Sequence, residues 1–130
     1  MEERSYTANY NYAMSFLKFK QKEEAEYALK RALSQVPGNE KNENNIVYLS
    51  ILANLAFLAL ERRDLESSAR CVEEGLAVKN NHADLLFIKA LMLMDIKRFD
   101  EMLEALILYL LAIDVTDAGK FNYQHAGNDT

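Results

Sequence analysis

The sequence predicts an all-α fold in which three helix-turn-helix repeats stack as a right-handed α-solenoid. The composition is the first reason, because 50% of the 130 residues are hydrophobic and only four glycines and one proline are present. Such a chain is rich in helix formers and poor in helix breakers. The second reason is that apolar residues recur with the period of an α-helix. The third is that the pattern repeats itself along the chain.

The repeats become visible when three short segments are aligned: Glu24-Ala25, Ser67-Ser68 and Glu101-Met102. Twelve residues before the second member of each segment stands an alanine, and four residues after it stands an apolar side chain. Two of these alanines, Ala56 and Ala90, are 34 residues apart, whereas Ala13 and Ala56 are 43 residues apart. The extra residues coincide with the polar, turn-forming segment 37–45, which we interpret as an enlarged loop between repeats.

Periodicity and helix-end signals predict six helices. Their expected ranges are 6–19, 22–36, 44–61, 65–79, 83–96 and 99–113. Asp64 and Asp100 stand where side-chain caps would start the second helices of the second and third repeats. Gly38 and the pair Asn80-Asn81 suit helix exits, where a left-handed backbone conformation is tolerated.

A 34-residue unit of two helices, with small residues where they cross and Pro37 closing the first copy, resembles the tetratricopeptide repeat. The resemblance covers Tyr6 to Asp114. It implies a single domain with repeats at about 6–39, 49–82 and 83–116, followed by a tail at 117–130. Met102 and Tyr109 depart from the pattern, because they replace small residues in the third copy. They imply looser packing or an altered crossing angle there.

In stacked repeats of this kind, the first helix of each pair lines the concave side, which is the expected partner-binding groove. The predicted groove consists of Tyr10, Asn11, Met14, Asn54, Phe57, Asp84, Phe87, Ile88 and Leu91. Leu17, Leu60 and Met94 share the predicted face with Leu91. For these four residues an alternative stays open, in which they pack against adjacent helices and do not line the groove. This mostly apolar surface fits an amphipathic helix, a neighbouring domain or a second copy of the chain.

One familiar mode of tetratricopeptide arrays holds the C-terminal carboxylate of a peptide with Lys, Arg and Asn side chains. Only Asn54 stands at a matching place here. Asp84 stands where that mode needs a basic or amide group, and its charge would repel a carboxylate. We therefore reject a carboxylate clamp.

The last predicted helix lacks the polar outer face that a terminal repeat usually has. Its residues from 103 to 113 are apolar on all sides except for Glu104, which is typical of a helix that is covered on more than one side. The tail carries Phe121 and Tyr123 and could fold back over the helix. Otherwise another repeat, another domain or a second subunit would have to cover it.

A narrower resemblance involves the third repeat and the tail. The segments 80–90, 98–101 and 121–127 are similar to the repeat region that follows the catalytic domain in some bacterial family-2-type glycosyltransferases. No catalytic aspartate motif and no nucleotide-binding strand pattern occur in this chain. The resemblance implies that the chain is the non-catalytic, protein-binding or dimerising part of such an enzyme.

Charge and cysteine content narrow the class of function. A formal net charge of −5 and a pI near 5.1 argue against nucleic-acid binding and against an anionic membrane surface. The single cysteine, Cys71, cannot form an internal disulfide, which favours a reducing, cytoplasmic location. No secretory signal is recognisable. The longest apolar stretch, Ile46 to Leu60, is shorter than the roughly 20 residues of a membrane-spanning helix.

No arrangement of residues in the sequence predicts catalysis, a metal site or a cofactor. His82 and His125 have no Cys or His partner at ligand spacing. Cys71 lies in a predicted helix without a histidine at helical spacing, so we interpret it as a small hydrophobe. Adjacent carboxylates, as in Glu23-Glu24 and Glu73-Glu74, point about 100° apart on a helix and cannot converge on one site.

The expected function is therefore that of a non-enzymatic adaptor or scaffold that binds a protein or peptide. Either the predicted groove or the apolar last helix would provide the surface. Two alternatives stay open, namely a self-association module and the non-catalytic segment of a larger glycosyltransferase-like enzyme.

Overall fold

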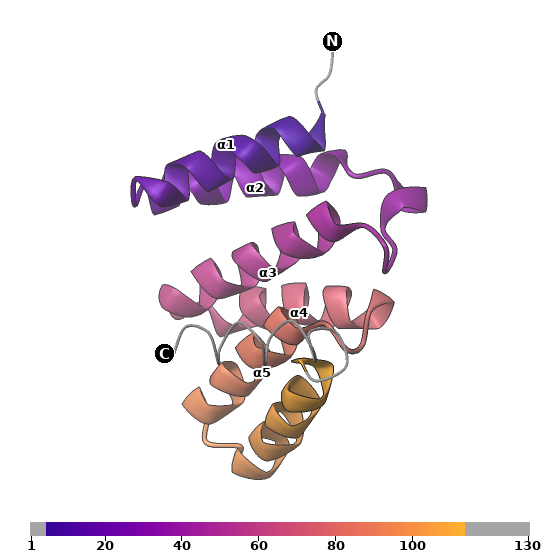
Figure 1. The fold of residues 1–130 in the computed structure, drawn as a ribbon. Coiled ribbons are helices and arrows are strands. Elements are labelled where there is room, and N and C mark those ends of the chain that lie inside the picture. Colours follow the sequence, from indigo (N-terminus) through magenta and orange to yellow (C-terminus); the bar gives the residue numbers. More distant parts are fainter. Residues whose placement is uncertain (1–4, 114–130) are drawn as a thin grey trace, which may run out of the picture. The chain divides into compact units, whose positions relative to one another are not determined.

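A computed structural model describes residues 5–113 of the chain (Figure 1). The elements are α1 (Tyr6–Lys18), α2 (Lys22–Gln35), the 3-10 helix η1 (Gly38–Glu40), α3 (Ile46–Glu61), α4 (Leu65–Val78) and α5 (Ala83–Asp95). Residues 99–113 form a further helix, which we call the last helix. The described residues contain no strand, so the all-α prediction is confirmed. The predicted helix ranges differ from the observed ones by at most two residues at either end.

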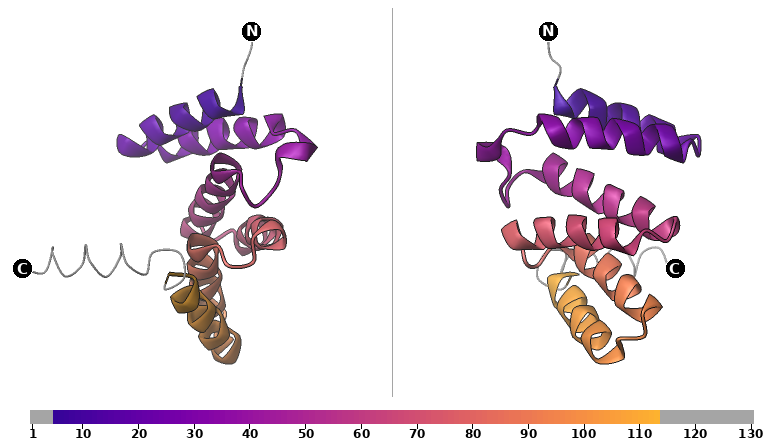
Figure 2. Two further views of the ribbon diagram at one scale, coloured as in Figure 1. Left: turned by 45° about the vertical axis from the view of Figure 1, so that its right-hand side comes forward. Right: turned by 180° about the vertical axis from the view of Figure 1, so that it is seen from behind.

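The chain divides into two compact units, Met1–Asn80 and Asn81–Thr130, which we call unit 1 and unit 2. Unit 1 contains two helical hairpins, α1 with α2 and α3 with α4, and α2 packs against α3 to join them (Figures 1 and 2). In unit 2, α5 pairs with the last helix.

Small residues allow the helices of each hairpin in unit 1 to approach closely. Ala13 of α1 and Ala25 of α2 are both 0% exposed. Ala56 and Ser68 play the same part in the second hairpin, where both are also 0% exposed. The hydroxyl of Ser68 donates a hydrogen bond of 2.9 Å to the carbonyl of Ala56, so this buried polar side chain is satisfied.

Helix α3 is the centre of unit 1. It contacts α1, α2 and α4 and buries ten of its 16 residues. A helix with neighbours on several sides must be apolar around most of its circumference, as the segment Ile46–Leu60 is. The long apolar run in the sequence therefore reflects the central position of α3 within this unit.

Polar side chains cap the N-termini of four helices. The side chain of Ser5 accepts a bond of 3.3 Å from the amide of Ala8 and caps α1. In the same way, Asn45 accepts from the amide of Tyr48 at 3.0 Å and caps α3, and Asp64 accepts from the amide of Ser67 at 3.2 Å and caps α4. The imidazole Nδ1 of His82 accepts a bond of 3.3 Å from the amide of Leu85 and caps α5. The prediction for Asp64 is thus confirmed.

Three predicted helix ends were wrong. The pair Asn80-Asn81 is not left-handed, and α4 exits through an extended Lys79. The last helix already includes residue 99, so Asp100 lies inside its first turn. An acidic side chain there still interacts favourably with the helix dipole. Gly38 does not end α2 in a left-handed conformation, because α2 exits through an extended Val36 and Gly38 begins η1. No glycine of the described part has a positive φ.

The left-handed residues lie instead in the turn inside each hairpin, and all three are basic. Lys20, Arg63 and Lys97 have φ angles of 61°, 69° and 62°. Each turn closes with the same backbone hydrogen bond, in which the residue that follows the basic residue donates its amide to a carbonyl five residues earlier. The three bonds are Gln21 N to Phe16 O (2.8 Å), Asp64 N to Ala59 O (2.8 Å) and Arg98 N to Leu93 O (2.9 Å). This is the Schellman pattern of helix C-termini, in which glycine is the usual left-handed residue. Positive charge at this place suits the negative end of the helix dipole.

Glycine at these turn positions is expected to stabilise the protein. A left-handed conformation costs a residue with a Cβ atom about 1–2 kcal/mol, whereas the greater freedom of glycine in the unfolded chain offsets part of the gain. Lys20→Gly and Lys97→Gly should each raise the free energy of unfolding by about 0.5 kcal/mol, measured by urea denaturation. Lys20→Val is the contrasting variant, since a β-branched side chain is strained there, and it should lower the stability. Equal stabilities of the glycine and valine variants would contradict this account of the turn.

The enlarged loop between the hairpins of unit 1 is anchored by a small hydrogen-bond network. The hydroxyl of Tyr6 donates to Oε1 of Glu40 at 2.5 Å, and the amide nitrogen of Asn45 donates to the Glu40 carbonyl at 2.8 Å. The bond to Glu40 favours the protonated phenol and raises the pKa of Tyr6. These contacts tie the start of α1 to the segment that leads into α3.

In unit 2, the two helices meet at another small residue. Ala90 and Leu93 of α5 form a buried cluster with Ala105, and Met102 and Leu106 pack against it. Tyr109 places its ring 5.2 Å from that of Phe87. Met102 and Tyr109, the two large residues of the third copy, are therefore partly buried contacts of this hairpin.

Candidate functional site

Part of the predicted groove lies in unit 1, where α1 and α3 are in contact. The hydroxyl oxygens of Tyr10 and Ser50 are 2.8 Å apart and share a hydrogen bond. The side-chain nitrogen of Asn54 donates to the carbonyl of Ser50 at 2.8 Å, one turn earlier in α3. Tyr10 and Asn54 therefore have hydrogen-bond partners within unit 1, and the bond between Tyr10 and Ser50 links α1 to α3.

The remaining groove candidates of unit 1 differ in exposure. Asn11 is exposed, Met14 is half-buried and Phe57 is 43% exposed. Among the residues left open, Leu17 is half-buried and Leu60 is 9% exposed. Leu60 is thus a core residue, whereas Phe57 presents a large part of its ring to solvent.

The groove candidates of unit 2 lie on α5. Asp84 is exposed in the first turn, and Leu91 is half-buried. Phe87 is 41% exposed and its ring contacts Tyr109, while Met94 is 49% exposed. Ile88 is only 5% exposed, so its side chain offers almost no surface to a partner.

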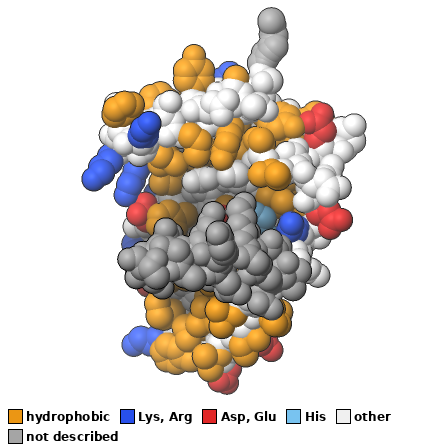
Figure 3. Space-filling view, in the orientation of Figure 1, with side chains coloured by type: hydrophobic (Ala, Val, Ile, Leu, Met, Phe, Trp, Pro, Cys, Tyr) orange, Lys and Arg blue, Asp and Glu red, His pale blue; other side chains and the backbone are white. Residues whose placement is uncertain are grey.

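The largest group of exposed apolar side chains is on the last helix. Figure 3 shows hydrophobic side chains gathered over the hairpin of unit 2, at the lower end of the view. Six side chains of the last helix that would usually be buried are about half exposed: Phe99 (52%), Leu103 (53%), Ile107 (56%), Leu108 (48%), Leu110 (62%) and Leu111 (56%). We call these six side chains the apolar face. Ala105 and Ala112, both 2% exposed, mark the buried side of the last helix. Ile107 points away from them and therefore lies near the centre of the apolar face.

Charge is distributed unevenly along the last helix. Asp100, Glu101 and Glu104 are exposed and lie in its N-terminal half. Arg98 forms an ion pair with Glu101. From Ala105 to Ile113 there is no charged residue. The apolar face is therefore acidic at one end and purely apolar at the other.

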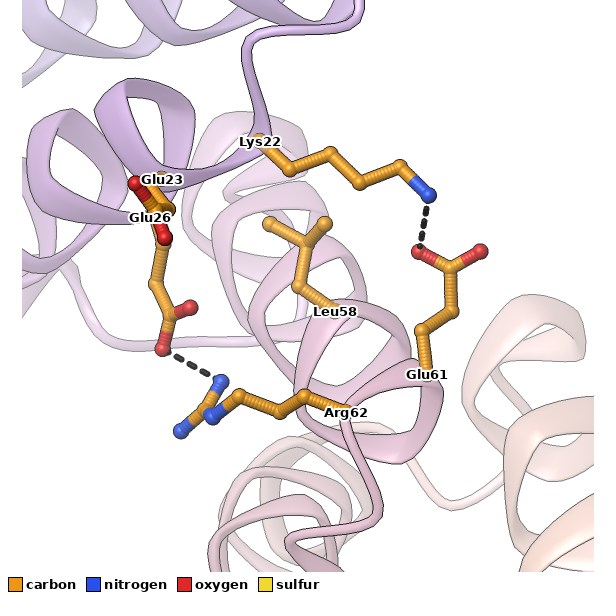
Figure 4. A pocket seen from close by; sticks show the side chains of 6 residues that line it. All are labelled: Lys22, Glu23, Glu26, Leu58, Glu61 and Arg62. Atoms are coloured by element: carbon orange, nitrogen blue, oxygen red, sulfur yellow. Dashed lines mark ion pairs between the residues drawn. The ribbon is translucent and has the colours of Figure 1, made fainter.

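A pocket of ≈ 260 Å³ lies between α2 and α3 in unit 1, with Leu58 on its wall (Figure 4). Charged side chains cross it as ion pairs, Lys22 to Glu61 at 3.1 Å and Arg62 to Glu26 at 2.6 Å. Lys30 adds a second cation 3.3 Å from Glu26. These pairs join the first hairpin to the second, so we interpret the pocket as part of the contact between two repeats.

The shifted pKa values of Cys71 and Tyr48 in unit 1 do not indicate a reactive site. Burial, and then the charge of Glu74, raises the pKa of the Cys71 thiol, which disfavours the nucleophilic thiolate. Tyr48 is 1% exposed and its hydroxyl donates to Oε2 of Glu74 at 2.7 Å. Burial and this hydrogen bond raise the pKa of Tyr48. Both shifts thus favour the neutral forms of these side chains.

The described residues contain neither a metal-binding cluster nor a membrane span. Among residues 5–113, no three His, Cys, Asp or Glu side chains gather closely enough to hold a metal ion. Within the same range, no helix is both long and apolar enough to cross a membrane. His125 and the aromatic residues of the tail, Phe121 and Tyr123, lie outside the described residues.

Sequence reasoning missed the hydrogen bond between Tyr10 and Ser50, the ion pairs between α2 and α3, and the basic left-handed turns. Only the turns had a readable signal, because Lys20, Arg63 and Lys97 recur at the same place in each aligned repeat. The other contacts join side chains from different helices, and no local pattern marks them.

The chain was compared with protein-family models and with curated proteins, and nothing matches in either comparison.

Proposed function

We propose that this chain is a tetratricopeptide-like module that binds another protein and is not itself a catalyst. The observation that carries the proposal is the apolar face of the last helix, whose six large side chains are about half exposed. Scattered exposed hydrophobic residues are normal, but a continuous apolar face of this size is typical of an interaction surface.

The partner in this proposal is a protein or peptide with an apolar helical face, rather than a nucleic acid or a membrane. An acidic chain with a formal net charge of −5 is poorly suited to phosphate backbones and anionic lipids. A cytoplasmic location completes the proposal, since the single thiol of Cys71 fits a reducing compartment.

The apolar face is a better candidate than the groove that the sequence predicts. Tyr10 and Asn54 are engaged in hydrogen bonds within unit 1, and Ile88 is 5% exposed. Phe57 in unit 1 and Phe87 in unit 2 each keep about two fifths of their surface exposed, and each provides a minor surface of its own unit. The proposal therefore assigns the main contact to the last helix and a minor one to these rings.

The proposed architecture is a right-handed α-solenoid of three tetratricopeptide-like hairpins. Three features support it, namely the equivalent turns at Lys20, Arg63 and Lys97, the small residues at the helix crossings, and the packing of α2 on α3. Repeats stacked in this way contact only their neighbours, and the proposal assigns the partner contact to the outer helix of the third repeat.

Photo-cross-linking in an extract of the cells that make the protein tests the proposal. A photoreactive phenylalanine analogue at position 108, at the edge of the apolar face, is expected to form a discrete product with a protein. The matched control carries the same analogue at Ile46, which is 79% exposed in unit 1. Adding Ile107→Glu to the first probe should remove the product, because a carboxylate disrupts an apolar contact. No product from position 108, or equal products from both probes, would exclude the apolar face as a binding surface.

A further inference from the structure

We propose that the partner of the apolar face is the same helix of a second copy of the chain, in an antiparallel arrangement with its two-fold axis at Ile107. This inference rests on the proposed function and specifies its partner. It follows from three properties of the last helix, namely the symmetry of its apolar positions, the placement of its acidic residues and the area that it exposes.

Three positions at the centre of the apolar face are self-complementary when the helix is reversed about Ile107. Leu103 and Leu111 are each four residues from Ile107, and all three are more than half exposed. In an antiparallel pair centred on Ile107, each Leu103 therefore meets Leu111 of the second copy, and Ile107 meets its own counterpart. A two-fold interface requires this property, because the same surface must fit itself.

The acidic residues favour the antiparallel orientation over the parallel one. In a parallel pair, Asp100, Glu101 and Glu104 of the two copies would lie side by side and repel. In the antiparallel pair, the two copies of each residue lie about 21 Å apart along the helices for Asp100, about 18 Å for Glu101 and about 9 Å for Glu104, at 1.5 Å per residue. These separations exceed the Debye length of about 8 Å at physiological salt, so the repulsion is weaker than in the parallel pair. Antiparallel helix dipoles also attract each other.

The exposed area is sufficient for a reversible dimer. Six large side chains that are about half exposed present roughly 600 Å² of apolar surface per chain, at the upper end of the largest patch on a typical monomer. Two copies would cover at most about 1,200 Å² together, which is the lower limit for specific, stable interfaces. The dimer is therefore expected to dissociate on dilution rather than to be permanent.

The first experiment measures the mass of the purified full chain by light scattering over a wide range of concentration. The mass is expected to rise from that of one 14.9 kDa chain to twice this value. Ile107→Glu places two carboxylates on the two-fold axis and should weaken the dimer by about 100-fold or more. Ile46→Glu, at an exposed apolar position of unit 1, should leave the dimer unchanged. Circular dichroism confirms that both variants keep their helices.

Disulfide trapping in a Cys71→Ala background tests the register. Ile107→Cys should form an interchain disulfide, because the two copies of this residue face each other at the axis. Leu103→Cys alone should not, since its two copies would be about 12 Å apart along the helices, beyond the roughly 7 Å limit between bridged Cα atoms. A mixture of the Leu103→Cys and Leu111→Cys chains should form the bridge that neither forms alone.

These experiments test the antiparallel dimer separately from the proposed function. A monomer at every concentration, or a dimer that Ile107→Glu leaves intact, would overturn the inference. Efficient trapping of Leu103→Cys alone would point to a parallel pair and would overturn it as well. If the purified chain is monomeric but the probe at position 108 captures a different protein, the inference fails and the proposed function stands.

Discussion

Replacing Ala56 by leucine is expected to lower the free energy of unfolding by about 3 kcal/mol, because the added carbons have no space at the crossing of α3 and α4. Ala56 is 0% exposed, and its carbonyl accepts the hydrogen bond from the buried Ser68 hydroxyl. A larger side chain would push the two helices apart and break that bond. The loss should be measured by urea denaturation, followed by circular dichroism.

The matched control for this variant is Ala77→Leu, which makes the same change at an exposed position of α4. Leucine is almost as good a helix former as alanine, so the control should keep the wild-type stability within about 0.5 kcal/mol. If Ala56→Leu is as stable as the control, the close approach of the helices at Ala56 is not what holds this hairpin together.

Tyr48→Phe is expected to make the protein slightly less stable at neutral pH and relatively more stable in alkali. At neutral pH the variant loses the hydrogen bond to Glu74, at a cost of about 1 kcal/mol. In the folded protein, burial and this hydrogen bond raise the pKa of Tyr48 above that of the unfolded chain, which is about 10. Because the folded protein holds the phenol proton more tightly than the unfolded chain, the raised pKa adds to the free energy of unfolding. This contribution is complete below pH 10 and is lost as the pH rises above 10. The wild type should lose up to about 1.4 kcal/mol more per pH unit than the variant there.

The measurement is the free energy of unfolding from pH 7 to pH 11.5, for the wild type, Tyr48→Phe and Tyr27→Phe. Tyr27 is 65% exposed, so its variant should follow the wild-type curve. The pKa of Tyr6 is also raised, which leaves some alkaline sensitivity in every one of these proteins. Parallel curves for the wild type and Tyr48→Phe would show that the buried phenol of Tyr48 does not control the alkaline stability.

The helices of this protein could be predicted because their signals are local. Apolar periodicity and the cap at Asp64 depend on residues within a few positions of one another, and the observed helices begin and end within two residues of the predicted ranges. The small residues Ala13, Ala56 and Ala90 were found in the same way, and all three are buried. The exposed apolar last helix could also be read directly, since it lacks a polar side in the sequence.

The candidate site could be predicted only in part. Phe57 and Phe87 are exposed as expected, whereas Ile88 is buried and Tyr10 is bonded to Ser50. Helical periodicity predicts which residues share a face, but it does not predict which of them a neighbouring helix covers. A rotation of one residue about the helix axis, roughly 100°, separates a groove residue from a core residue.

By itself, then, the sequence determined the all-α class, the order and length of the helices, and the apolar character of the last one, because these depend on short-range patterns. The tertiary structure alone decided which side chains meet across helices. The bond from Tyr10 to Ser50 joins residues 40 positions apart, and that from Tyr48 to Glu74 joins residues 26 positions apart. Such contacts depend on how whole helices pack, and the spacing of residues within a single helix does not encode them.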